Sequence, residues 1–166
     1  MVCTALAAAW DLLHGRIPNR ITYTGMLAGV VLRGALGGRQ GLLDSLAGGL
    51  VGGGVFLAFF LLRGMGAGDV KLMTAVGCLV GLRQTLVITL ASAIAGGVLA
   101  LAVMLFYRRG VRTLRNLGTL FRFHMRFGLR PHPEINLENP EAVRVPYALA
   151  IAAGTFYAFG MILLQG

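Results

Sequence analysis

Residues 42–62 read LLDSLAGGLVGGGVFLAFFLL, an apolar run close to the ~20 residues that a helix needs to cross a bilayer. Gly48 and Gly52 lie four residues apart, and therefore on one face of such a helix. Small residues at this spacing let a neighbouring backbone approach closely. The stretch predicts a membrane-spanning helix with its glycine face packed on another helix.

Further apolar runs lie on both sides of this stretch. Gly15 and Pro18 end the first run, because proline lacks a donor and disfavours helix in the residue before it. The predicted fold is an all-α polytopic membrane protein, a single domain over residues 1–166 with six transmembrane helices. We expect these helices at 2–13, 21–36, 42–62, 70–82, 85–107 and 146–164.

The composition favours lipid as the solvent. Of the 166 residues 57% are hydrophobic and 13% charged, and the mean hydropathy is +0.77, whereas a soluble surface needs more charge. Cys3 and Cys78 form no CxxC pair, so neither a disulfide framework nor a metal or cofactor site is expected. The segment from Met1 to Trp10 lacks a positively charged start, and a cleaved signal peptide is not expected.

Positive charges predict how the chain is oriented. Twelve of the 15 lysines and arginines fall in three alternate loops, and only Arg33, Arg39 and Arg83 fall on the opposite side. Cytoplasmic loops accumulate such residues, so these three loops should face the cytoplasm. The net charge of +9 thus reports membrane orientation, and a nucleic-acid partner is not expected.

The largest of these loops is a basic insertion at about 108–145. At 111–126 apolar residues recur every three or four positions, and arginines recur alongside them. That pattern is typical of a basic amphipathic helix lying on a membrane surface. We expect this cytoplasmic segment to contact anionic lipid.

The three aspartates of the chain all fall in or beside predicted spans, where an ionised carboxylate is costly and is a functional candidate by default. Asp11 and Asp69 lie at the cytoplasmic ends of two helices, near the same membrane depth. Asp44 lies near the outer end of the helix at 42–62, where we expect it to face water or to cap that helix.

Two carboxyl groups brought close in a low-dielectric site share a proton, so that one can activate water while the other donates to a carbonyl oxygen. That is the chemistry of aspartyl peptidases. Gly66 and Gly68 precede Asp69 and leave room for an extended substrate along the loop. Asp11 and Asp69 are therefore the candidate catalytic residues, and Gly66 and Gly68 the candidate substrate-binding residues.

Three motifs resemble the type IV prepilin peptidases. The stretch GAGDVKL at 66–72 resembles that family's GxGD signature, and Asp11 followed by IPN at 17–19 is similar to its first catalytic segment. The stretch VPY at 145–147 is similar to the start of the last helix in small members. GxGD alone also occurs in presenilin and signal peptide peptidase, whereas its pairing with the first segment is specific.

The resemblance implies an aspartic endopeptidase of the bacterial inner membrane, with Asp11 and Asp69 as its catalytic acids. The implied substrate is a prepilin, whose short basic leader is cut on the cytoplasmic side. Larger members also methylate the pilin and carry a cysteine-rich zinc segment before the first aspartate. Ten residues without such cysteines precede Asp11 here, so the chain resembles the small peptidase-only form, often linked to tight-adherence pili.

Simpler interpretations remain open for each of these residues. Asp69 could only cap its helix, and Asp11 could be an interfacial acid or a partner of Arg16. Lys71 could be a membrane-side anchor, or it could bind substrate, as we predict. For the whole chain, the alternative to a peptidase is a non-catalytic membrane scaffold or assembly factor for pilus or secretion machinery. A transporter is disfavoured, because no inverted repeat is present.

Overall fold

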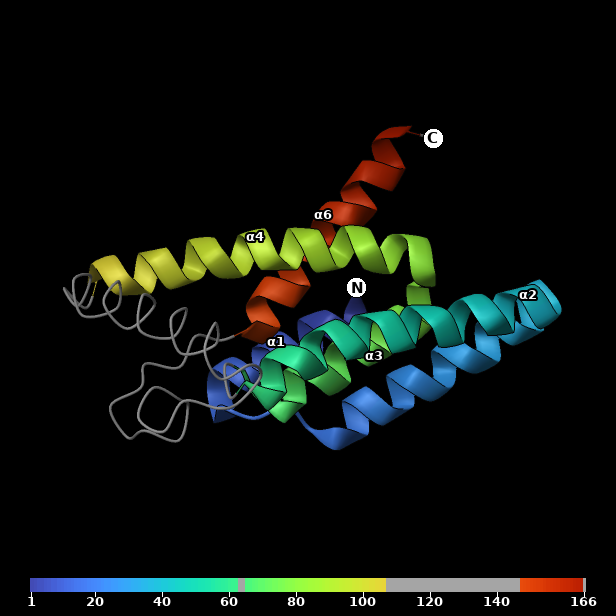
Figure 1. Ribbon diagram of the computed structural model, residues 1–166, viewed down its shortest axis with the longest axis horizontal. Coiled ribbons are helices and arrows are strands. Elements are labelled where there is room, and N and C mark those ends of the chain that lie inside the picture. Colours follow the sequence, from blue (N-terminus) through green and yellow to red (C-terminus); the bar gives the residue numbers. More distant parts are fainter. Residues whose placement is uncertain (63–64, 107–146, 166) are drawn as a thin grey trace, which may run out of the picture.

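The computed structural model describes residues 1–62, 65–106 and 147–165. Every regular element in these residues is an α-helix, which confirms the predicted all-α class (Figure 1). The helices are Val2–His14 (α1), Asn19–Leu61 (α2), Ala67–Val80 (α3), Leu82–Phe106 (α4) and Tyr147–Gln165 (α6). The predicted basic segment at 108–145 lies outside the described residues.

Helix α2 corresponds to two predicted helices joined end to end. At Gly38 the backbone has φ 56° and ψ −143°, a conformation that is open essentially to glycine alone. The chain folds back there, so that α2 consists of a first arm (19–37) and a second arm (39–61) that run away from the turn in a V (Figure 1). Gly41 helps to close the turn, because its missing side chain leaves room for the Arg33 carbonyl.

Helix α3 packs against both arms of α2 through glycine contacts. A Cβ atom on Gly29 of the first arm would lie 2.6 Å from the backbone of Cys78. A Cβ atom on Gly77 of α3 would lie 2.5 Å from the carbonyl carbon of Gly48 in the second arm. The predicted close packing of the glycine face is therefore confirmed, and α3 is the neighbour.

The core receives side chains from every described helix. Ala7, Phe56, Leu72, Ile88 and Ile151 are all buried in one cluster, and they come from α1, α2, α3, α4 and α6 in that order. Helix α6 packs mainly on α4, and its first turns reach α1 (Figure 1). The start of α6 and the end of α1 thus meet at the end of the molecule where α3 begins.

Three described helices are long and apolar enough to cross a membrane, namely Asn19–Leu61, Leu82–Val103 and Tyr147–Leu164. Helices α1 and α3 have 13 and 14 residues and are shorter than a full span requires. The chain is therefore an apolar helical membrane protein. The topology of six spans stays a prediction.

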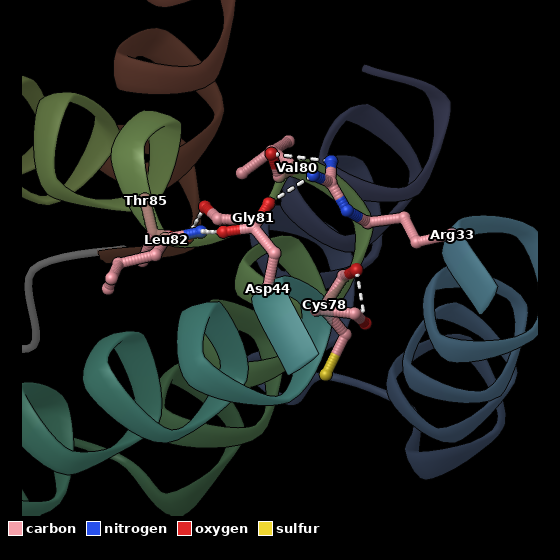
Figure 2. Close-up of polar contacts among 8 residues, drawn as sticks. Arg33, Asp44, Cys78, Val80, Gly81, Leu82 and Thr85 are labelled. Atoms are coloured by element: carbon pink, nitrogen blue, oxygen red, sulfur yellow. Dashed lines mark hydrogen bonds and ion pairs between the residues drawn. The ribbon is translucent and has the colours of Figure 1, made fainter. Parts of the chain in front are cut away.

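At the far end of α3, Asp44 joins α2 to the turn between α3 and α4 (Figure 2). Its Oδ1 accepts the Leu82 N–H at 3.0 Å, and its Oδ2 accepts a bond from Arg33. Arg33 also donates to the Val80 carbonyl at 2.8 Å. Gly81 has φ 81° between these groups, where a Cβ atom would lie 2.6 Å from the guanidinium group. Asp44 therefore caps α4 and not its own helix, while 40% of its side chain is exposed, which agrees with the prediction that it faces water.

The cap predicts a graded loss of stability on substitution. Asp44→Ala removes both the acceptor for Leu82 and the partner of Arg33, and should lower the free energy of unfolding by about 1–2 kcal/mol. Asp44→Asn keeps an acceptor oxygen and should lose less. Thermal unfolding of the detergent-solubilised protein measures both. Equal losses for the two variants would show that the cap contributes nothing.

Candidate active site

Asp11 occupies the last turn of α1, and Gly15 ends that helix. Gly15 adopts the left-handed conformation with φ 63°, and its N–H donates to the Asp11 carbonyl at 2.7 Å. The Asp11 side chain is half-buried. On the preceding residue, the Trp10 ring stacks on His14 with the ring centroids 4.5 Å apart. Among the described residues the only ion pair joins Arg33 and Asp44, so Asp11 is not paired with Arg16.

Asp69 occupies the first turn of α3 and is buried, with 9% of its surface exposed. The helix begins three residues earlier than predicted, so Asp69 lies inside its first turn. Its Oδ2 accepts the Gly66 N–H at 3.2 Å, and its own N–H donates to the Gly66 carbonyl at the same distance. Asp69 is therefore a cap of α3, as the simpler interpretation proposed. The contact uses one carboxylate oxygen, and capping is compatible with catalysis.

The two glycines of the GxGD stretch have different surroundings. Gly66 is exposed, and a Cβ atom there would lie 3.3 Å from Asp69 Oδ2. Gly68 is half-buried, and a Cβ atom would lie 3.1 Å from the Ile17 side chain. Both positions thus favour glycine, Gly66 beside the carboxylate and Gly68 beside the turn between α1 and α2.

Asp11 and Asp69 lie on helices that contact each other, because α1 packs on α3 and Ile17, just after α1, lies against Gly68 next to Asp69. Burial is the main cause that raises the pKa of the Asp69 carboxyl group, and the charge of Asp11 raises it further. The two acids are 58 positions apart in the sequence. The turn at 15–18 and the hairpin of α2 lie between α1 and α3 in the chain. That the two carboxyl groups act as one catalytic pair stays a prediction.

Tyr147 belongs to the VPY stretch noted in the sequence, but no role in the site is predicted for it from the sequence. It is the first residue of α6, is half-buried, and lies close enough to Asp69 to feel its charge. A Cβ atom on Gly96 of α4 would lie 3.1 Å from its ring, so α4 holds the ring in place. The available signal was a phenol placed directly after Pro146, at the beginning of an apolar helix.

Lys71 points to α2. Its Nζ donates to Asn19 Oδ1 at 2.9 Å and lies 5.4 Å from the centroid of the Tyr23 ring. The predicted contact between Lys71 and a substrate stays a prediction, as do the substrate contacts of Gly66 and Gly68. The described contacts of the ammonium group are within the protein.

A half-buried and a buried carboxyl group thus lie on two contacting helices, at the end of α1 and the start of α3. Such a pair can share a proton, so that one acid serves as base and the other as acid. Fold and site together define a helical membrane protein with a two-carboxyl site.

The family model of the type IV leader peptidases matches residues 1–101, which include both acids and the GxGD stretch. The chain belongs to the type IV leader peptidase family, and the family is one of proteases. Neither a curated protein nor a solved structure shows a significant match to the chain.

Proposed function

We propose that this protein is an aspartic endopeptidase that removes the short basic leader of a type IV prepilin, with Asp11 and Asp69 as its catalytic acids. The observation that carries the proposal is the placement of these two carboxyl groups at contacting ends of α1 and α3, in a leader peptidase chain. Both acids lie within the matched residues. The basic segment at 108–145 contributes a contact with anionic lipid.

The proposed chemistry requires one proton shared between two acids. The ionised acid takes a proton from a water molecule, whose oxygen attacks the scissile carbonyl, while the protonated acid donates to the carbonyl oxygen. The tetrahedral intermediate collapses when the acid that took the water proton passes it to the leaving amine, while the other acid takes back a proton from a hydroxyl of the intermediate, which restores the shared proton. Burial of Asp69 favours its neutral form, because a low-dielectric site penalises charge. The half-buried Asp11 is then the acid more readily ionised.

The substrate side of the proposal follows from the loop before α3. Gly66 is exposed and presents its backbone beside the Asp69 carboxylate, where an extended chain can approach. The hydrophobic helix of the prepilin would remain in the bilayer beside the apolar helices. The leader would reach the site from the cytoplasmic side of the inner membrane, and tight-adherence pilins are the proposed class.

The test is cleavage of a prepilin in membranes that contain this protein as the sole peptidase. We expect a product shortened by the leader, which a gel shift and the mass of the new N-terminus both reveal. Membranes with the Asp69→Asn variant at matched expression are the control. Association with the prepilin without any shortened product would support the scaffold alternative instead.

The proposed orientation predicts which positions a membrane-impermeant thiol reagent can reach in intact cells. In a variant without Cys3 and Cys78, a cysteine at position 39 or 83 should be labelled from outside. A cysteine at position 16 or 115 should be labelled only after the membrane is opened. Rapid labelling at position 16 or 115 in intact cells would overturn the topology.

A further inference from the structure

We propose that Lys71 is a positioning residue, which with Asn19 and Tyr23 forms a latch that holds α3 against the start of α2. Lys71 follows Asp69 by two residues on α3, and Asn19 begins α2 directly after the turn that follows Asp11. The latch therefore joins the two segments that carry the acids and sets the separation of the two carboxyl groups. This inference rests on the proposed function, and it gives Lys71 a task other than substrate binding.

Both partners of Lys71 come from one face of α2. Asn19 is the first residue of that helix, and Tyr23 follows it by four positions, which places the two side chains one above the other. The ammonium group donates to the Asn19 amide oxygen and lies over the Tyr23 ring. A hydrogen bond and a cation–π contact thus engage it together.

The position of Lys71 on α3 separates it from the catalytic side. Lys71 follows Asp69 by two residues, and side chains at that spacing do not face the same side of a helix. The Asp69 carboxylate is buried and accepts its hydrogen bond from the Gly66 N–H. Lys71 is therefore placed to hold α3 from a side of the helix other than the side that Asp69 occupies.

A second contact lies next to the latch and joins the same two segments. The Ile17 side chain packs on Gly68 in the first turn of α3, and Asn19 binds Lys71 at the start of the next turn. The chain between Asp11 and Asn19 is short, and Gly15 fixes the end of α1 within it. A shift of α3 relative to Ile17 and Asn19 changes the distance between the acids. A misplacement of about 1 Å can cost ~10²-fold in rate.

The experiment measures kcat and KM for prepilin cleavage with purified protein in proteoliposomes. Lys71→Met retains most of the side chain and removes the charge, and Asn19→Leu removes the acceptor. We expect each to lower kcat about 10–100-fold with little change in KM. The double variant should be no slower than the slower single variant, because both remove one contact.

Conservative variants provide the rescue that a purely structural loss would not show. Asn19→Asp keeps an acceptor for the ammonium group, and Lys71→Arg keeps a cation for Asn19 and Tyr23. Both should recover most of kcat relative to Asn19→Leu and Lys71→Met. Leu27→Ala is the matched control, since Leu27 is 67% exposed one turn beyond Tyr23 and should leave kcat and KM unchanged.

Three results would overturn the latch: multiplying losses in the double variant, no rescue by Asn19→Asp, or a raised KM in Lys71→Met. Recovery of Lys71→Met activity on a prepilin from which an acidic residue has been removed would assign Lys71 to substrate binding. These outcomes leave the proposed function intact, because the wild-type protein still cleaves. Absence of cleavage by the wild-type protein would instead refute the proposed function itself.

Discussion

Asp69→Asn and Asp11→Asn should each abolish leader cleavage, with a loss of at least about 10²–10⁴-fold, while the protein remains folded and inserted. An amide can neither take the proton of the attacking water nor exchange the proton that the pair shares. Asparagine at position 69 still offers an oxygen to the Gly66 N–H, so the cap of α3 survives the substitution. The gel shift of a prepilin, at matched expression, measures the loss.

The double variant is the sharper measurement. Since the acids act as one unit, removing both should be hardly worse than removing either, whereas independent contributions would multiply. Asp44→Asn is the matched control, because it makes the same chemical change at the Arg33 end of the molecule and should cleave normally per folded molecule. Substantial cleavage by Asp69→Asn would end the aspartic peptidase proposal.

The second large effect is expected where α3 crosses the second arm of α2. Gly77→Ala should lower the free energy of unfolding by about 1–3 kcal/mol or more, because the new methyl group overlaps the Gly48 backbone and neither helix can move away freely. Gly29, on the first arm, contacts α3 beside this crossing and prevents an easy shift. The unfolding midpoint of the detergent-solubilised protein, compared with that of the wild type, measures this loss of stability.

The same substitution at Gly54 is the control. Gly54 is exposed on the second arm, and a Cβ atom there meets nothing within 4 Å. Gly54→Ala should therefore be neutral or gain about 0.5–1 kcal/mol from reduced backbone freedom. A lower free energy of unfolding for Gly77→Ala, together with an unchanged or higher one for Gly54→Ala, would show that the loss at position 77 comes from packing and not from helix propensity. Equal effects would mean that the crossing is less tight than the backbone distances indicate.

Much of the helical architecture could be predicted from the sequence, because long apolar runs and glycine or proline breaks act locally. The prediction for α1 ended within one residue of the structure, and the glycine face of the second arm was correctly expected to pack. The predicted start of α3 is three residues too late. Gly66 and Gly68 have low helix propensity and indicate a break, but the Asp69 cap allows the helix to begin at Ala67. Local patterns could not show that Gly38 alone reverses α2.

For the site, the two acids could be predicted and their surroundings could not. Asp11 and Asp69 are ionisable residues in an apolar chain, which is a strong signal in sequence alone. The roles of Asp44 and Lys71 depend on partners 38 and 52 positions away, Leu82 and Asn19, and no local pattern announces such pairs. Tyr147 likewise reaches Asp69 only through the packing of α6.

The stacked Trp10 ring gives the protein a built-in optical reporter. Trp10 is the only tryptophan of the chain, is 47% exposed and directly precedes Asp11. All intrinsic tryptophan emission therefore originates one residue from a proposed catalytic acid, at the end of α1. A tryptophan-free prepilin that settles on this end should change that emission without any added dye. With the Asp69→Asn variant, substrate arrival could be followed in isolation from bond cleavage.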